Sequence, residues 1–427
     1  MTTEVADPTL VPPEVAQTGR EGNSVGAHVG RWWDGVRAGD VGSLPIIVAL
    51  LIITIFFQYK NHLFLSGGNV ANLIGQVAPT AVIAMGVVFV LLLGEIDLSI
   101  GYVSGIGGVV VAELQTGGHW AALPGWLSIV CALLACAAIG LVEGSFVAFV
   151  GVPSFVVTLA FLLGLQGVIL HLIGVTGVIS IQNNTIFQFA NYNLKTTTAW
   201  ICTAVVLGIY VFSVVSGVVS RRRHGIISDN LVLVTTKLVV IVGATVFVVA
   251  WLNGEITMPW EPANLSQGVP FVTFVILVPL VFLTWVAIRT RFGRHVYAVG
   301  GNAEAARRAG INVRVIRWWV FGISGVMAGL GGVIIASRLS SVDLNAGGGT
   351  ILLDAIAAAV IGGTSLFGGR GEIKSALLGA LIIASIANGM SLLGYSAATQ
   401  YIVTGVILLA AVTLDTISRR RLVAAGR

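Results

Sequence analysis

Four carboxylic acids lie within or between strongly apolar stretches, and they are the first candidates for chemistry in this chain. Glu95 and Asp97 lie two residues apart in GEIDLSIG, whereas Glu143 and Asp354 each lie inside an apolar run. Ionisable side chains are costly inside a membrane and are therefore functional candidates wherever they occur there. Such carboxylates could hold protons or cations, or they could shape a polar path.

A plainer interpretation of GEIDLSIG stays open from the residues alone. The segment joins two apolar runs, and Asp97 or Ser99 could cap the helix that follows, because acidic and hydroxyl side chains favour helix starts. Glu95 and Asp97 would then belong to a solvated turn. Glu143 lies well inside its run, so we expect its carboxyl to face protein, protonated or hydrogen-bonded, rather than lipid.

The sequence offers no support for enzymatic chemistry. It contains no HExxH, CxxC or GxSxG pattern, and the three cysteines all lie in apolar runs. The tract GGRGEIKS, 368–375, is similar to a nucleotide-binding loop. A Walker A loop, however, has Gly directly before Lys-Ser, and this chain has Ile373 at that position. We predict a protein that is not an enzyme, with no cofactor, no metal site and no ATP site of its own.

Composition indicates which elements must position these residues. The chain is 56% hydrophobic and 10% charged, and continuous apolar runs are long enough for helices that cross about 30 Å of hydrocarbon. Transmembrane barrels would instead show alternating segments of about ten residues. We therefore predict an all-α, polytopic membrane helical bundle of about twelve spans. The expected spans are 44–58, 70–93, 99–115, 124–150, 153–173, 199–219, 231–252, 270–288, 318–337, 350–366, 374–393 and 399–416.

The ends of the chain and its arginines predict an orientation. Residues 1–43 are rich in Pro, Gly, Glu and Thr and are expected to form a disordered cytoplasmic tail, without the apolar core of a signal peptide. The transmembrane domain is then 44–418, followed by a basic cytoplasmic tail, 419–427. Arginine clusters at 221–223, 289–317 and 419–421 alternate with loops that are poor in Lys and Arg. Because Lys and Arg are retained inside, both termini are predicted to be cytoplasmic.

Two expected spans have features of broken or re-entrant segments, which transporters use to build a pathway. The second begins with polar residues and contains Pro79, and the tenth is short, contains Asp354 and ends in a glycine-rich run. Small-x-x-x-small pairs allow the close helix approach that such a pathway uses, but ordinary tight packing is the favoured interpretation of each pair. These pairs are Gly101 with Gly105, Gly140 with Gly144, and Gly325 with Gly329.

The segment EAARRAG lies in an arginine-rich loop between two spans. Its helix formers Glu304, Ala305 and Ala306 are followed by Gly310, which predicts a short helix with a natural C-terminal stop. Such a helix could seat in a groove of a cytoplasmic partner, with the surrounding arginines orienting it on an acidic rim. The alternative interpretation is an amphipathic surface loop.

These segments together resemble a known family. The sequences GEIDLSIG (94–101), VPSFVVTLA (152–160), FGRHVYAVGGNAEAARRAGINV (292–313) and LDAIAAAVIGGTSLFGG (353–369), and the stretch 388–415, are similar to permease subunits of bacterial sugar ABC importers of the ribose, galactose and xylose type. The chain looks most like the xylose permeases. With these it shares NGMS at 388–391 and an inserted region, about 181–268, that holds RRRHG and the span 231–252.

The resemblance implies a multi-pass subunit of the bacterial plasma membrane that imports a monosaccharide, most simply D-xylose, by alternating access. It implies a homodimer, cytoplasmic ABC ATPase subunits that bind the ATP, an extracytoplasmic sugar-binding protein, and no nucleic acid. EAARRAG would be the ATPase-coupling element. Candidates for the translocation path are Glu95, Asp97, Ser99, Glu143 and Asn388. Members of the family often have Asn where this chain has Glu143 and Gly where it has Glu95, which leaves the exact sugar open.

An ion-coupled secondary sugar transporter is the alternative function. Glu95, Glu143 and Asp354 would then act as proton or cation sites. A carrier of that kind needs no coupling helix, so EAARRAG weighs against it.

Overall fold

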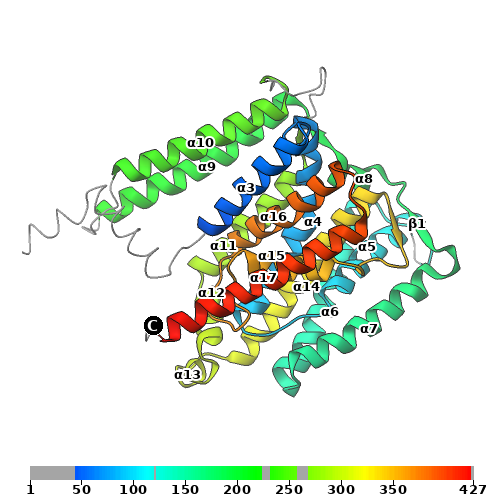
Figure 1. Ribbon diagram of the computed structural model, residues 1–427. Helices are drawn as coiled ribbons and strands as arrows, with labels where there is room; N and C mark the ends of the chain where they lie inside the picture. Colours follow the sequence, from blue (N-terminus) through cyan, green and yellow to red (C-terminus); the bar gives the residue numbers. More distant parts are fainter. Residues whose placement is uncertain (1–43, 120–121, 224–230, 257–267, 425–427) are drawn as a thin grey trace, which may run out of the picture. The chain divides into compact units, whose positions relative to one another are not determined.

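The computed structural model describes residues 44–119, 122–223, 231–256 and 268–424, and within them the chain is predominantly helical (Figure 1). The expected tail 1–43 lies outside the described residues, as do the loop positions 224–230 and 257–267. The described chain divides into two compact units: 195–223 with 231–251 in one, and 44–119, 122–194, 252–256 and 268–424 in the other.

Each of the twelve expected spans coincides with a helix. They are α3 (Leu44–Lys60), α4 (Gly67–Leu92), α5 (Ile100–Thr116), α6 (Gly125–Ser145) with its π-helical continuation η1 (Phe146–Val150), α7 (Ser154–Ile173), α9 (Thr196–Arg223), α10 (Leu231–Leu252), α11 (Val272–Arg289), α14 (Val313–Leu339), α15 (Ile351–Ile361), α16 (Ile373–Leu392) and α17 (Ala397–Ala424). Among the described residues, 8 helices are long and apolar enough to cross a membrane, and three shorter ones are also apolar. The predicted polytopic helical bundle is therefore confirmed.

Short elements connect the long helices. Helices α12 (Arg291–Gly301) and α13 (Ala303–Arg308) lie between α11 and α14, and α8 (Asn184–Asn191) and the turn η2 (Gly174–Thr176) follow α7. The strand β1 (Val178–Ser180) pairs antiparallel with β4 (Ser341–Asp343), and β2 (Asn193–Leu194) pairs with β3 (Val269–Pro270). Figure 1 shows α8 and α13 at opposite ends of the larger unit, which we call the α8 end and the α13 end.

Local sequence explains where these helices begin and end. Pro124 precedes α6 and Pro153 precedes α7, and proline suits a helix start because the first amides have no intrahelical acceptor. The α6–η1 helix ends at Gly151, whose φ of 85° is readily adopted by glycine. The chain can therefore reverse direction between η1 and α7 within three residues.

The two predictions of broken spans had different outcomes. Helix α4 is continuous with Pro79 inside it, so the predicted break there is wrong. Pro79 is buried, and α4 packs against α14 and α16 along its length, which holds the helix together despite one missing amide donor.

The tenth span is broken, as predicted. Helix α15 has 11 residues, a rise of only about 16 Å. The non-helical segment before it, 344–350, runs along α5, with Ala346 against Gly105 and Gly347 against Gly101. A half-length helix and a segment of turns thus together replace one full helix.

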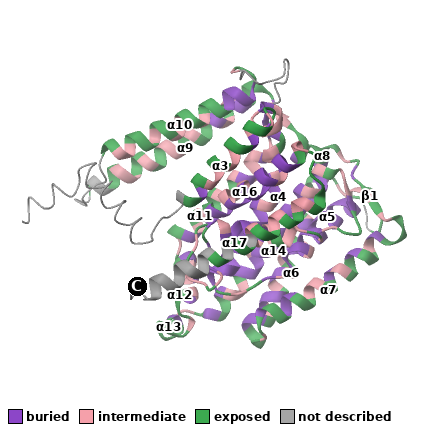
Figure 2. Ribbon diagram, in the orientation of Figure 1, coloured by how far each residue is buried: buried purple, intermediate pink, exposed green. Residues whose placement is uncertain are grey.

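The core of the larger unit surrounds α4, α5 and α14, which carry more buried residues than any other of the described helices (Figure 2). Helices α6 and α14 meet through glycines. Gly140 lies against the Phe321 carbonyl and Gly325 against the Cys136 carbonyl, so close that an added Cβ atom would collide with either. The small-residue pairs of α6 and α14 therefore serve tight helix packing, the plainer of the two interpretations.

Candidate functional site

Helix α13 contains the EAARRAG segment and is built as its sequence predicts. The side chain of Asn302 accepts a hydrogen bond from the Ala305 amide and caps the N-terminus, and Glu304 lies in the first turn, where a negative charge is favoured. Glu304 also forms ion pairs with Arg307 and Arg308, at 3.2 and 3.3 Å. The chain then leaves the helix through Gly310, whose φ is 84°.

The faces of α13 differ in exposure. Ala306 is buried in the chain's own core, whereas Glu304, Ala305, Arg307 and Arg308 are exposed. Of the two alanines expected to face a partner, only Ala305 is free to do so. The surface that α13 offers is therefore charged, with a small apolar centre.

A groove lies directly beside α13. It has a volume of about 630 Å³ and is lined by η1 with the glycine that ends it, 147–151, and by the loop that leads into α14. Arg307, Arg314 and Arg317 also line it, so the groove is basic.

Glu95 lies at this same end of the unit. Its Oε1 atom is 3.1 Å from Nε of Arg317, and its side chain is 15% exposed. The Arg317 Nε atom has no well-aligned hydrogen bond, so charge rather than hydrogen-bond geometry joins the two side chains. Glu95 therefore connects the α4–α5 junction with the beginning of α14.

Asp97 is buried at 6% exposure, so the expectation that it lies in a solvated turn is wrong, whereas its expected contact with the start of the next helix is present. Its Oδ1 atom accepts hydrogen bonds from the Ser99 amide at 3.0 Å and hydroxyl at 2.6 Å, and its Oδ2 atom accepts one from Ser324 of α14 at 3.0 Å. Ser99 lies at the start of α5, but its own side chain makes no capping hydrogen bond. The Asp97 carboxylate instead ties the α4–α5 junction to α14.

Glu143 completes this buried polar cluster, which we define as Asp97, Ser99, Glu143 and Ser324. Its side chain is 1% exposed, as expected from its position, and its carboxyl lies in interaction range of Ser99 and Asp97. The Glu143 Oε1 atom has no hydrogen-bond partner among the described residues. Two neighbouring carboxyls in a dry setting can hold a proton between them.

Asn388 lies apart from that cluster. Its side-chain amide exchanges two hydrogen bonds with that of Asn69, at 2.8 and 3.0 Å, where the beginning of α4 meets the end of α16. The structure thus brings Asp97, Ser99 and Glu143 together, places Glu95 beside Arg317, and leaves Asn388 on the other side of the unit. Asp354 is half-buried on α15 and belongs to none of these groups.

Sequence reasoning missed three partner residues. Arg317 was considered only as one of the arginines of its loop. Nothing in the sequence marked Asn69 or Ser324 as a partner of a candidate site residue, because single polar side chains are common in apolar helices.

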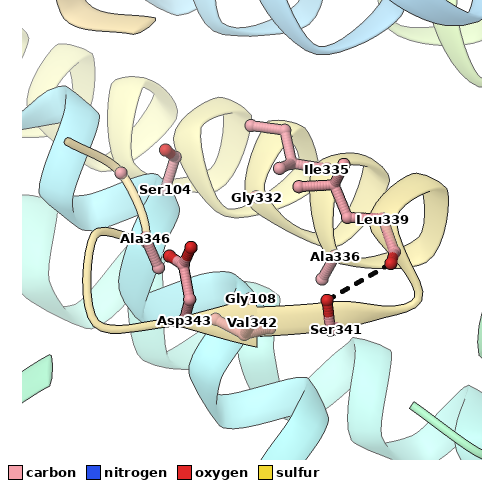
Figure 3. Close-up of a pocket in the computed structure, with 12 residues that line it drawn as sticks. Ser104, Gly108, Gly332, Ile335, Ala336, Leu339, Ser341, Val342, Asp343 and Ala346 are labelled. Carbon is pink, nitrogen blue, oxygen red and sulfur yellow. Dashed lines mark hydrogen bonds between the residues drawn. The ribbon is translucent and has the colours of Figure 1, made fainter. Parts of the chain in front are cut away.

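The enclosed space near the α8 end is small. Figure 3 shows a pocket between α5, α14 and the segment 341–347, with a volume of about 60 Å³. The Ser341 hydroxyl at its edge donates to the Leu339 carbonyl at 3.2 Å. Since sites for small-molecule ligands usually have about 300–1,000 Å³, this pocket has room for water but not for a sugar.

Comparison with known proteins identifies the chain's relatives. A family model described as "Branched-chain amino acid transport system / permease component" matches residues 69–412. The xylose transport system permease protein XylH of Escherichia coli (strain K12) is 37% identical over 398 residues, which is 91% of this chain and 95% of the relative. The corresponding Haemophilus influenzae protein is 34% identical over 88% of this chain and 96% of the relative.

A ribose import permease protein, RbsC of Escherichia coli (strain K12), is 33% identical over 86% of this chain and 92% of its own length. No solved structure matches the chain. The full-length agreement with permeases, together with the helices long enough to cross a membrane, makes this chain a multi-pass transport subunit of the bacterial inner membrane rather than an enzyme. It belongs to the family of permease components of the branched-chain amino acid transport system type.

Proposed function

We propose that this chain is the membrane-spanning subunit of an ATP-driven importer that carries a monosaccharide, D-xylose first among the candidates, into the cell by alternating access. Two copies form the transmembrane part, cytoplasmic ATPase subunits bind the exposed face of α13, and an extracytoplasmic sugar-binding protein delivers the substrate. The observation that carries this proposal is the exposed, charged α13 in a chain that matches sugar permeases along almost its whole length.

The arginine distribution supports a cytoplasmic position for the α13 end. The connection between α11 and α14, with the first turns of α14, contains seven arginines, and positively charged loops are retained on the cytoplasmic side. They are Arg289, Arg291, Arg294, Arg307, Arg308, Arg314 and Arg317. ATPase subunits in the cytoplasm would then meet α13 and the basic groove beside it.

The choice of xylose rests on the relatives. Xylose permeases match 95% and 96% of their own lengths at 37% and 34% identity, and a ribose permease matches at 33%. A permease served by a binding protein needs little affinity of its own for the sugar. The path is proposed to lie between two copies of the chain.

The buried pair of Asp97 and Glu143 favours one second candidate, an ion-coupled secondary sugar transporter. Two neighbouring buried carboxyls could serve as a proton site in a proton-coupled carrier. A carrier of that kind does not need an exposed coupling helix such as α13. We therefore favour the ATP-driven importer over the secondary carrier.

Reconstitution tests the two candidates against each other. The chain is placed in proteoliposomes with its candidate ATPase and binding protein, and entry of labelled xylose is followed with and without ATP. We expect uptake that requires ATP and all three components, with competing ribose and galactose mapping the specificity. Uptake by the chain alone that disappears when an ion gradient is collapsed would establish the secondary carrier instead.

A further inference from the structure

The segment that leads into α13 meets two other backbone segments at Gly300. Gly300, near the end of α12, lies so close to the Leu92 carbonyl that an added Cβ atom would collide with it, and this Cβ would lie 2.8 Å from the Gly369 amide nitrogen. Only glycine fits here, and the reason is space rather than backbone conformation. The next residue, Gly301, has open space where its Cβ would be.

Three backbone segments meet at this point, which we call the glycine joint and define by Leu92, Gly300 and Gly369. The Gly369 amide donates a hydrogen bond to the Leu92 carbonyl at 2.9 Å, and this bond links the end of α4 to the loop between α15 and α16. Gly300 packs against both of these backbones. Since no flexible side chain lies between them, the three segments can move only together.

Tyr297 supports the joint one helical turn before Gly300. Its hydroxyl donates to the Gly371 carbonyl at 2.8 Å. Burial, and secondarily the nearby Glu372 carboxylate, raise the pKa of Tyr297, so its phenol stays protonated and keeps donating at neutral pH. Helix α12 is thus fixed to the α15–α16 loop by a second contact.

The other side of α13 leads to the same place. Helix α14 begins directly after EAARRAG, and its Arg317 forms the 3.1 Å ion pair with Glu95, three residues beyond Leu92. Both flanks of α13 therefore converge on residues 92–95. Two residues further along, Asp97 enters the buried polar cluster through its bond to Ser324.

We propose that Gly300 is a positioning residue for coupling. When α13 is displaced, Gly300 transmits the displacement at the glycine joint to the α4–α5 junction and to the broken span of α15. Because backbone contacts backbone there, none of the displacement is taken up by rearrangement of side chains. The inference rests on the proposed function, since it gives α13 the partner that displaces it. A larger residue at position 300 should therefore lower sugar uptake while ATP hydrolysis continues, and the exposed surface of α13 should stay unchanged.

The first test compares Gly300→Ala with its neighbour Gly301→Ala in the reconstituted three-component system. Gly300→Ala is expected to lower ATP-driven sugar uptake about tenfold, while ATP hydrolysis by the assembled complex stays within about twofold of wild type. Gly301→Ala is the matched control, because it adds one methyl group to the same helix end but into open space. It should match wild type in both measurements. Equal fall of uptake and hydrolysis in Gly300→Ala, or unchanged uptake, would overturn the proposal.

A second pair keeps the test decisive if Gly300→Ala does not reach the membrane. Gly369→Ala approaches the joint from the loop side, where its Cβ would lie 3.1 Å from the Gly301 Cα atom and where φ is 74°. Gly363→Ala in the same loop has a φ of 95° and open space, so it imposes backbone strain without touching the joint. We expect Gly369→Ala, but not Gly363→Ala, to lower the ratio of sugar uptake to ATP hydrolysis. The same ratio of uptake to hydrolysis in both variants would contradict the proposal.

The wild-type measurement distinguishes failure of this inference from failure of the proposed function. Wild-type uptake that needs ATP, combined with normal coupling in Gly300→Ala and Gly369→Ala, rejects the glycine joint alone. Wild-type uptake that does not depend on ATP would reject the ATP-driven importer as the function. The ATPase proposed to displace α13 would then be rejected as well.

Discussion

The two ends of the larger unit are held together by different kinds of contact. At the α13 end, backbones meet directly at Gly300 and an ion pair joins Glu95 to Arg317. At the α8 end, side-chain hydrogen bonds join the helices beside the short β1–β4 and β2–β3 strand pairs, among them the Asn69–Asn388 amide pair and the bond from the Ala190 amide to the Ser337 hydroxyl. Direct backbone contact transmits displacement, whereas exchangeable hydrogen bonds can open and close. The difference is what a transporter needs if it is driven from one end and admits its substrate at the other.

The buried polar cluster should show the largest effect, because it continues the α13 end into the core. Asp97→Ala removes the acceptor of the Ser99 and Ser324 hydroxyls and leaves buried polar groups unpaired, at an expected cost of about 3 kcal/mol in the free energy of unfolding. Thermal unfolding of purified protein in detergent measures it. Asp97→Asn retains the size and one acceptor oxygen and should lose less. Equal stability of both variants would show that the cluster does not hold the α4–α5 junction to α14.

The exposed face of α13 comes next. Glu304→Arg replaces the partner of Arg307 and Arg308 with a third positive charge, and we expect the protein to insert normally while ATP-driven uptake falls about tenfold or more. Glu304→Gln, which removes the ion pairs without reversing the charge, should have a smaller effect. Membrane content by immunoblot and uptake in proteoliposomes separate insertion from coupling. Normal ATP-dependent uptake by Glu304→Arg would remove the coupling assignment.

How far the sequence predicted these two ends depended on the range of the interactions. The spans and the α13 stop at Gly310 follow from apolar run length and local turn chemistry, which are properties of consecutive residues. The continuity of α4 through Pro79 was missed because neighbouring helices stabilise it. The partners Ser324 and Asn69 were missed because each lies more than 200 positions from the residue it binds. Gly300 looked like one glycine among many, since only three-dimensional contact reveals that Leu92 and Gly369 leave no space beside it.

The amide pair at the α8 end should have a moderate effect. A double-mutant cycle with Asn69→Ala and Asn388→Ala measures its coupling free energy, expected to be about 1 kcal/mol, because interhelical hydrogen bonds in membranes average about 0.6 and reach about 1.7 kcal/mol. Thermal unfolding of the four proteins gives the value. A coupling above about 2 kcal/mol would mean that the α8 end is locked as firmly as the α13 end, and the contrast between them would fail.

The ion pair at the α13 end should have the smallest effect on stability. Glu95 is 15% and Arg317 32% exposed, so solvent screening reduces their attraction, and a cycle of Glu95→Gln with Arg317→Gln should give about 0.5 kcal/mol. The value should fall further as salt is raised from 0.05 to about 0.5 M, because the Debye length shortens. Uptake should respond more strongly than stability if the pair guides the movement of α14 relative to the α4–α5 junction. A large, salt-independent coupling in the unfolding measurement would instead mean that the pair is a buried structural element, and the α13 end would then depend on charge as much as on its glycine contact.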